Sequence, residues 1–378
     1  MKNKRAKTRR VSGLKIWCLH GLAGLATVLP VTAYDEIHRY RPILFFSESR
    51  LSRDALMSLK AQADHGSASK AYNACGNKVP LADIFGDAYH EKIALIGTKN
   101  MPPPCTNFAQ RLTFTELILT WSQNFARGFF VSCYIPFRTI HLYNFPQITP
   151  YNPLQQHESM LRGMGDFACS MGWAYNCEDT EKIDFIDVAM QIGIALPTSK
   201  PTLGNDLFDI NLGYEGKTGC FFIMDGACGI FDWLTFGAHL QGLFFEHQAI
   251  HHTVLTDEAP ASSISTCLPS KRDSAWGVGA YGKADHLILG FSGTLAYSFT
   301  YQGPQIWNFN QLMPDQLQRL AAWSMHVIHV ELDYDLATYS NPYAPSIGIA
   351  YNKAVAGTNV FDTSLWGGIA EFTMLFTF

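Results

Sequence analysis

The chain has 378 residues, 47% of them hydrophobic and 16% charged, and its 28 basic and 32 acidic residues leave a net charge of −4. Seven of the basic residues and none of the acidic ones lie in the first 33 residues, so the remainder carries 21 − 32 = −11. Nucleic-acid binding depends on neutralising phosphates with Lys and Arg, so we expect no nucleic-acid partner. After residue 33 no stretch reaches 18 consecutive apolar residues, which argues against membrane-spanning helices.

The N-terminus has the three parts of an export signal. A basic segment precedes an apolar stretch from Ile16 to Val31, and small residues follow up to Ala33. An N-terminal membrane anchor is the alternative, but this stretch is shorter than the roughly 20 apolar residues that span hydrocarbon. We therefore predict that residues 1–33 are a signal peptide cleaved after Ala33, and that residues 34–378 form a single domain.

The segment that follows is mostly polar. Arg39 to Ser49 is its one strand-like run, and Pro42 suits only an edge or the start of a strand. Residues 50–110 are predicted to be a long loop or a plug. Because exported chains can oxidise their thiols, Cys75 and Cys105 in this segment are a candidate disulfide, with two unpaired thiols as the alternative.

From residue 111 onward the dominant pattern is strict alternation. Between Leu287 and Gln302 nearly every second residue is large and apolar, while the residues between are Gly, Ala, Ser, Thr or Ile. The same alternation occurs in 165–176 and 185–197. Alternation places successive side chains on opposite faces of a strand, and these strands of roughly 10–15 residues exceed the usual mean of about 5–6.

Twelve strands are expected in all. In chain order they are 39–49, 111–122, 127–141, 165–176, 185–197, 218–230, 233–246, 275–284, 286–301, 322–336, 345–355 and 363–378. The connections between them alternate between short and long, as in transmembrane barrels with short periplasmic turns and long outer loops.

The last strand carries a resemblance. Counting back by twos from Phe378 gives Phe376, Met374 and Phe372, while Thr377, Thr373 and Glu371 have the other parity. This amphipathic strand with a terminal Phe is similar to the carboxy-terminal insertion signal of Gram-negative outer-membrane proteins. The resemblance covers only the last dozen residues, and it implies a location in the bacterial outer membrane and recognition by the barrel-assembly machinery.

The fold class predicted from these patterns is all-β, a transmembrane antiparallel up-and-down barrel of about 12 strands, within a range of 10–14. A sheet can span a bilayer only if it closes on itself, because hydrocarbon offers no partner to a free backbone group. A secreted β-sandwich is the alternative, but its strands would be shorter and charged on the solvent face.

No motif supports a cofactor, a metal site or a catalytic group. Gly277 to Gly282 fits G-x-G-x-x-G but lies in a strand that another strand follows, so dinucleotide binding is not expected. No Cys-x-x-Cys pair suggests structural zinc. Ser324 and His326 share a parity but lie roughly 7 Å apart on one strand, too far for a nucleophile and its base.

Polar residues on the inward parity are the candidate site. The pore-lining candidates are Glu116, Asp187, Asp225, His239, Gln241, Glu331, Asp333, Asp335 and Glu371. Carboxylates facing water attract cations and repel anions. Lys283 and Arg138 are candidate counter-charges on the wall. The alternative is that plug or loop bases, namely Lys60, Lys70 or Lys78, neutralise the acids.

The sequence thus predicts a porin-like channel for passive diffusion of small polar solutes, with a preference for cations. An outer-membrane barrel enzyme and a structural or adhesive surface protein are the alternatives. The expected partners are outer-membrane lipid, the barrel-assembly machinery and the solutes, and the sequence does not indicate an oligomeric state.

Overall fold

The computed structural model describes most of the chain from residue 55 to residue 375. The described ranges are 55–81, 110–147, 155–180, 183–199, 212–213, 218–230, 233–245, 249–255, 263–272, 274–288, 290–307, 322–336 and 343–375. Residues 1–33 lie outside these ranges, so the signal peptide stays a prediction. In the described part of the chain no helix is long and apolar enough to cross a membrane.

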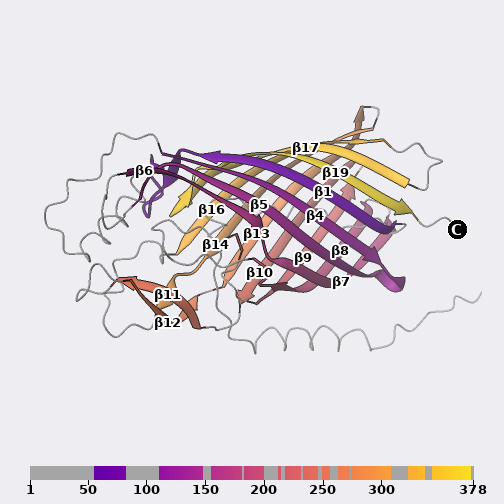
Figure 1. The fold of residues 1–378 in the computed structure, drawn as a ribbon. Coiled ribbons are helices and arrows are strands. Elements are labelled where there is room, and N and C mark those ends of the chain that lie inside the picture. The colour runs from indigo at the N-terminus through magenta and orange to yellow at the C-terminus, as the bar shows by residue number, and fades with distance from the viewer. Residues whose placement is uncertain are drawn as a thin grey trace, which may run out of the picture. The chain divides into compact units, whose positions relative to one another are not determined.

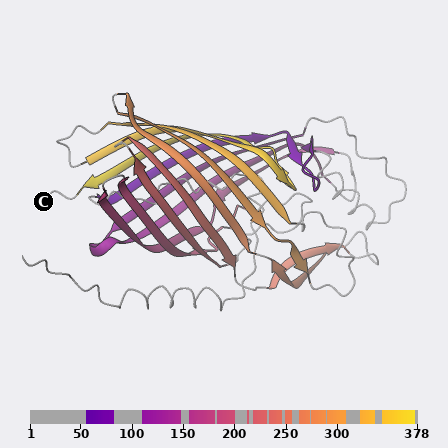
Figure 2. The same cartoon turned by 180° about the vertical axis from the view of Figure 1, so that it is seen from behind.

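Twelve antiparallel strands form a closed ring (Figure 1, Figure 2). In ring order they are β1 (Ala55–Ala68), β4 (Arg111–Asn124), β5 (Phe129–Gln147), β7 (Phe167–Thr180), β8 (Ile183–Leu196), β9 (Gly219–Ile230), β10 (Leu234–Phe245), β13 (Ala275–Ile288), β14 (Phe291–Gln302), β16 (Trp323–Asp335), β17 (Tyr343–Thr358) and β19 (Ser364–Leu375). β1 closes the ring, because it pairs with β19 on one side and β4 on the other. The predicted fold class and strand number are confirmed.

The identity of the first strand was predicted wrongly. The ring is complete with Ala55–Ala68, which lies inside the segment expected to be a loop or plug, while Arg39–Ser49 lies outside the described residues. The outward parity of this strand holds Ala61, Ala63 and His65, so it lacks the row of large apolar residues that marks the other strands. Pairing on both edges, rather than an amphipathic pattern, sets its place in the wall.

The alternation separates an apolar outside from a polar inside. On β8, for example, Ile192 and Ile194 are exposed, whereas their neighbours Gln191 and Gly193 face inward. Large apolar side chains exposed around a whole barrel would carry a large free-energy cost in water, at about 25 cal/mol per Å². In lipid the same surface is favourable, and the closed ring satisfies the backbone inside the bilayer. The barrel is therefore built for a membrane, and closed antiparallel barrels of this kind belong to the bacterial outer membrane.

The two ends of the barrel differ. Short turns such as 125–128, 181–182 and 231–233 join strands at the end that also carries the C-terminus of β19, and we call it the short-turn end. The opposite, long-loop end has the longer connections, such as 69–110 and 303–322. The predicted alternation of short and long connections agrees with this arrangement.

One strand of the ring is interrupted. β6 (Gln155–Met164) precedes β7 along the same line. It pairs only with the part of β5 nearer the long-loop end, whereas β7 pairs with the part of β5 nearer the short-turn end. At the break Thr198 Oγ1 accepts from Phe167 N–H and donates to Gly165 O, and Asp166 accepts from Ser199 N–H. These bonds satisfy backbone groups that the change of partner would otherwise leave open.

Two small sheets accompany the ring. One consists of β18 (Val360–Phe361), β2 (Lys70–Tyr72) and β3 (Lys78–Pro80). The other consists of β11 (Ala249–Leu255), β12 (Ser263–Arg272) and β15 (Gln305–Trp307).

Candidate functional site: the barrel interior

The interior is polar, and acids outnumber bases on its wall. Register pairs place all the predicted candidates on inward parities: His239 opposite Asp225, Gln241 opposite Gly277, and Glu116 opposite Arg138. Asp187, Glu331, Asp333, Asp335 and Glu371 follow the same parity on their strands. The inward basic residues of the described strands are Lys60, Arg138 and Lys283.

Glu116 and Arg138 form a buried ion pair between β4 and β5. The Arg138 Nε donates to Glu116 Oε1 at 2.6 Å, and the Arg138 and Glu116 side chains are only 7% and 2% exposed. Arg138 Nη1 also donates to the carbonyl oxygen of Leu212, which lies in the connection after β8. Arg138 thus neutralises Glu116 and fixes Leu212 against the inner wall.

A second polar cluster lies on β16 and β17. The His329 ring contacts Asn352 Oδ1 through Nδ1 at 2.6 Å and Glu331 Oε2 through Nε2 at 3.0 Å. Asp333 lies next along the inward face of β16, and the Lys60 and Lys283 ammonium groups interact with it electrostatically. The carboxylates of β16 are therefore partly compensated by lysines of the wall.

Lys60 was expected in a loop or plug, and this expectation is wrong. It faces inward on β1, directly opposite Glu371 of β19. Glu371 also accepts a hydrogen bond from the Ser58 hydroxyl at 2.5 Å. The idea that Lys60 balances inward acids is supported, because the lysine interacts electrostatically with both Glu331 and Asp333.

Small residues make room for the polar side chains of β9, β10 and β13. A Cβ atom at Gly277 would overlap the Gln241 side chain, and one at Gly279 would overlap the His239 ring. The Tyr281 hydroxyl donates to Asp225 Oδ1 at 3.3 Å. The glycines of the G-x-G-x-x-G pattern at 277 and 279 therefore serve close packing inside the barrel.

The small sheet of β2, β3 and β18 packs on the inner wall at the long-loop end, and we call it the inner cap. Tyr72 of β2 joins an apolar cluster with the inward residues Trp323, Met325 and Val327 of β16. A second cluster joins Ala71, Leu81, Leu212 and Phe361 to inward residues of β1, β4, β5 and β19. The inner cap therefore covers inward faces of several neighbouring strands.

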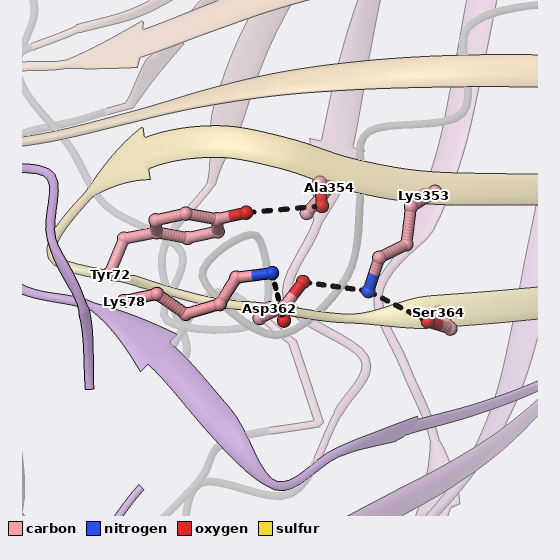
Figure 3. A network of polar contacts seen from close by, with 6 residues as sticks. All are labelled: Tyr72, Lys78, Lys353, Ala354, Asp362 and Ser364. Carbon is pink, nitrogen blue, oxygen red and sulfur yellow. Dashed lines mark hydrogen bonds and ion pairs between the residues drawn. The ribbon is translucent and has the colours of Figure 1, made fainter. Parts of the chain in front are cut away.

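Polar contacts fasten the inner cap to the rim of the barrel (Figure 3). Asp362 bridges two lysines: Lys78 Nζ lies 2.7 Å from Oδ2, and Lys353 Nζ lies 2.6 Å from Oδ1. Lys353 also donates to the Ser364 hydroxyl at 2.9 Å. The bond to Asp362 raises the pKa of Lys78 above its usual value of 10.5. Lys78 thus binds an acid of the rim, not the acids of the wall.

Sequence reasoning predicted a loop or plug in 50–110, but it did not predict the inner cap, which consists of part of that segment and β18. Tyr72 contacts Trp323, and Lys78 contacts Asp362, only when residues far apart in the chain are folded together. The available signal was that the inward parity of β16 turns apolar toward its long-loop end, at Trp323, Met325 and Val327. An apolar inward patch in a polar interior indicates that another segment covers it.

The remaining candidates lie away from the interior. Ser324 and His326 face outward, where Ser324 Oγ bonds Thr358 Oγ1 at 3.0 Å and His326 Nδ1 bonds the Tyr297 hydroxyl at 2.5 Å. Cys75 is an exposed cysteine between β2 and β3, and Cys105 lies outside the described residues, so their disulfide stays a prediction.

Solved structures share this architecture at low sequence identity. A crystal structure of an outer membrane channel from Pseudomonas putida F1 matches with a TM-score of 0.58 and 10% identity, covering 87% of this chain and 98% of that one. The transport unit of the autotransporter AIDA-I from Escherichia coli matches at 0.44 and 8%, covering 90% and 96%. The NanC porin matches at 0.38 and 9%, covering 84% and 100%. No family model and no curated protein matches the sequence. The match to the Pseudomonas putida channel shows a shared fold.

Proposed function

We propose that this barrel is a porin-like channel for passive diffusion of small polar solutes, with a preference for cations. The observation that carries the proposal is a closed transmembrane wall whose inward face is polar and bears more carboxylates than basic groups. The crystallised channel from Pseudomonas putida F1 supports it as an example of this fold in a channel.

Exposure along the wall indicates where a solute could contact it. At the level of the inner cap and just below it, inward side chains are sealed: Asn352 is 0%, Asp64 1% and Gln302 1% exposed. By contrast, Gln191 and Asp225, on β8 and β9, remain partly exposed. Other inward residues of these strands are buried as well, such as His239 at 6%, Gln241 at 7% and Ser298 at 5% exposed, so Gln191 and Asp225 mark only where a solute could contact the wall.

The charges on this path are expected to favour cations moderately. Carboxylates lower the potential energy of a cation in a confined lumen, and wall lysines offset part of that effect. Lys60 interacts electrostatically with Glu331 and Asp333, and Lys283 with Asp333, so the net field is smaller than the number of acids alone would give.

Conductance in planar bilayers tests the proposal. The refolded protein is expected to conduct, with a reversal potential in a salt gradient that shows cation preference. Changing Glu331→Gln, Asp333→Asn and Asp335→Asn together should shift that potential toward zero, and Lys283→Gln should shift it the opposite way. Unchanged potentials in both variants would contradict the role given to these charges.

A deletion variant distinguishes a channel that residues 70–108 close from a barrel that cannot conduct even without them. β1 and β4 are neighbours, with Ala68 opposite Leu112, so a short Gly-Ser linker can replace residues 70–108 and leave the wall intact. If neither the full chain nor this deletion variant conducts, the channel proposal is wrong.

Assembly is expected to follow the general route for such barrels. β19 lies at the C-terminus and pairs on both edges, with β1 and β17. We propose that the barrel-assembly machinery recognises this final strand. A chain lacking the last three residues, which include Phe376 and Phe378, should then accumulate unfolded in the periplasm while still refolding in detergent.

A further inference from the structure

Two cysteines face each other across the junction of β5 and β7. Cys133 and Cys169 are direct partners in the antiparallel register, and their Sγ atoms lie 2.6 Å apart. Both lie on the outward parity of their strands and are half-buried. The proposed passage of solutes does not involve either cysteine.

Backbone geometry suits a covalent link at this position. Directly opposed residues of an antiparallel pair have Cα atoms about 4.5–5.5 Å apart, within the range of about 4.4–6.8 Å that disulfides require. The other outward cysteines of the described strands face apolar partners instead: Cys177 and Cys228 lie opposite Ile186, and Cys220 lies opposite Ile194. Position therefore singles out one pair.

The pair lies at the base of the interrupted strand. β5 and β7 are partners only from Phe129↔Trp173 to Tyr134↔Ala168, and beyond that point β5 pairs with β6. A bond between residues 133 and 169 would close a covalent loop that contains the rest of β5 and all of β6. It would also link β5 to β7, the two neighbouring wall strands that share the fewest register pairs.

We propose that Cys133 and Cys169 form a disulfide in the folded barrel. An outer-membrane protein passes through the periplasm, where thiols become oxidised. One cysteine thiolate attacks the disulfide of an exported thiol–disulfide oxidoreductase, and the second then displaces the enzyme from the mixed disulfide. Two thiols lose two electrons and two protons to form one S–S bond, and the enzyme leaves as a dithiol.

Oxidation precedes or accompanies closure of the barrel. Both Sγ atoms point to the outer surface, which contacts lipid after insertion, so a soluble oxidoreductase reaches them only while the chain is still periplasmic. Once formed, the bond is shielded from soluble reductants by the same lipid. The barrel thus carries a permanent link at the β5–β7 junction.

Peptide mapping tests the link directly. The full chain with its export signal is produced in cells with an oxidising periplasm, and thiols are blocked by alkylation at lysis. Trypsin cleaves after Arg127, Arg138, Arg162 and Lys182, so Cys133 lies in peptide 128–138 and Cys169 in peptide 163–182. We expect these two peptides joined in the non-reduced digest and separate after reduction.

Matched variants assign the bond to its two sulfurs. Peptide 163–182 also contains Cys177, so Cys177→Ser should leave the linked pair unchanged, whereas Cys133→Ser should render Cys169 fully alkylated without reductant. Cys220 and Cys228 serve as internal controls that alkylate after denaturation in every variant. Heat-dependent gel mobility shows that each variant folds.

Two results would overturn the proposal. One is complete alkylation of both Cys133 and Cys169 in the denatured, non-reduced wild type. The other is a linkage of either residue to a different cysteine. As an independent readout, reduction in the denatured state before refolding should lower the urea midpoint of unfolding in the wild type and leave that of Cys133→Ser unchanged. Equal responses of the two proteins would also contradict the link.

Discussion

Replacing Arg138 with Met should destabilise the barrel far more than its size change suggests. The guanidinium neutralises Glu116 at 2.6 Å and holds the carbonyl of Leu212, and both side chains of the pair are almost fully buried. Removing one partner of a buried pair leaves an uncompensated charge, which typically costs about 3–5 kcal/mol. We expect a loss of that size in the free energy of unfolding.

The matched double variant separates lost charge pairing from lost packing. Glu116→Gln combined with Arg138→Met removes both charges, and replacing a buried ion pair by neutral groups is often close to neutral. The double variant should therefore recover most of the stability, to within about 1–2 kcal/mol of the wild type. Urea titrations in lipid vesicles, followed by tryptophan fluorescence, measure both. If the single and double variants unfold at the same urea concentration, the buried pair does not control stability as described.

Further expectations concern the inner cap and the packed glycines. The bond to Asp362 raises the pKa of Lys78, so the Lys78–Asp362 contact is complete below the lysine's usual pKa of 10.5 and is lost as pH rises through the higher folded value. Single-channel conductance should therefore rise above about pH 10.5. Asp362→Asn should show the larger conductance already at neutral pH. Tyr72→Ala removes the cap's anchor on Trp323 and should also increase conductance, with an unchanged value counting against the cap as a constriction. Gly279→Val would overlap the His239 ring and should cost roughly 1–3 kcal/mol in urea titrations, whereas Gly282→Val, on the outward parity, should cost less.

Local pattern was enough to predict most of the wall. From Ile186 to Leu196 on β8 and throughout β14, every large apolar residue has the parity that faces outward, so alternation alone gave both the strands and the inward candidates. β1 escaped because Ala61, Ala63 and His65 weaken its outward stripe. Its place is decided by pairing with β19, whose partner residues lie some 300 positions away in the chain.

Partnerships across the interior depend on register, which the sequence does not show. The parity of Glu116 was predictable, but its bond to Arg138 follows from the alignment of β4 with β5. The inner cap depends on still more distant contacts, such as Lys78 with Asp362. The excess of inward carboxylates was predictable. Lys60 was correctly expected to balance them, but it lies on a wall strand and not in a loop or plug.

The two-sided character of the wall can be tested by placing the same charge on each side at one level. Ile192 is 60% exposed on the outward face of β8, and its neighbour Gln191 faces the interior. Arginine on the lipid face near the bilayer middle costs about 2–4 kcal/mol, so Ile192→Arg should make the free energy of folding into vesicles less favourable by about that amount. Gln191→Arg should change it far less and should shift the reversal potential toward anions. Equal costs at the two positions, or a greater cost at 191, would contradict a lipid-facing exterior and a polar interior.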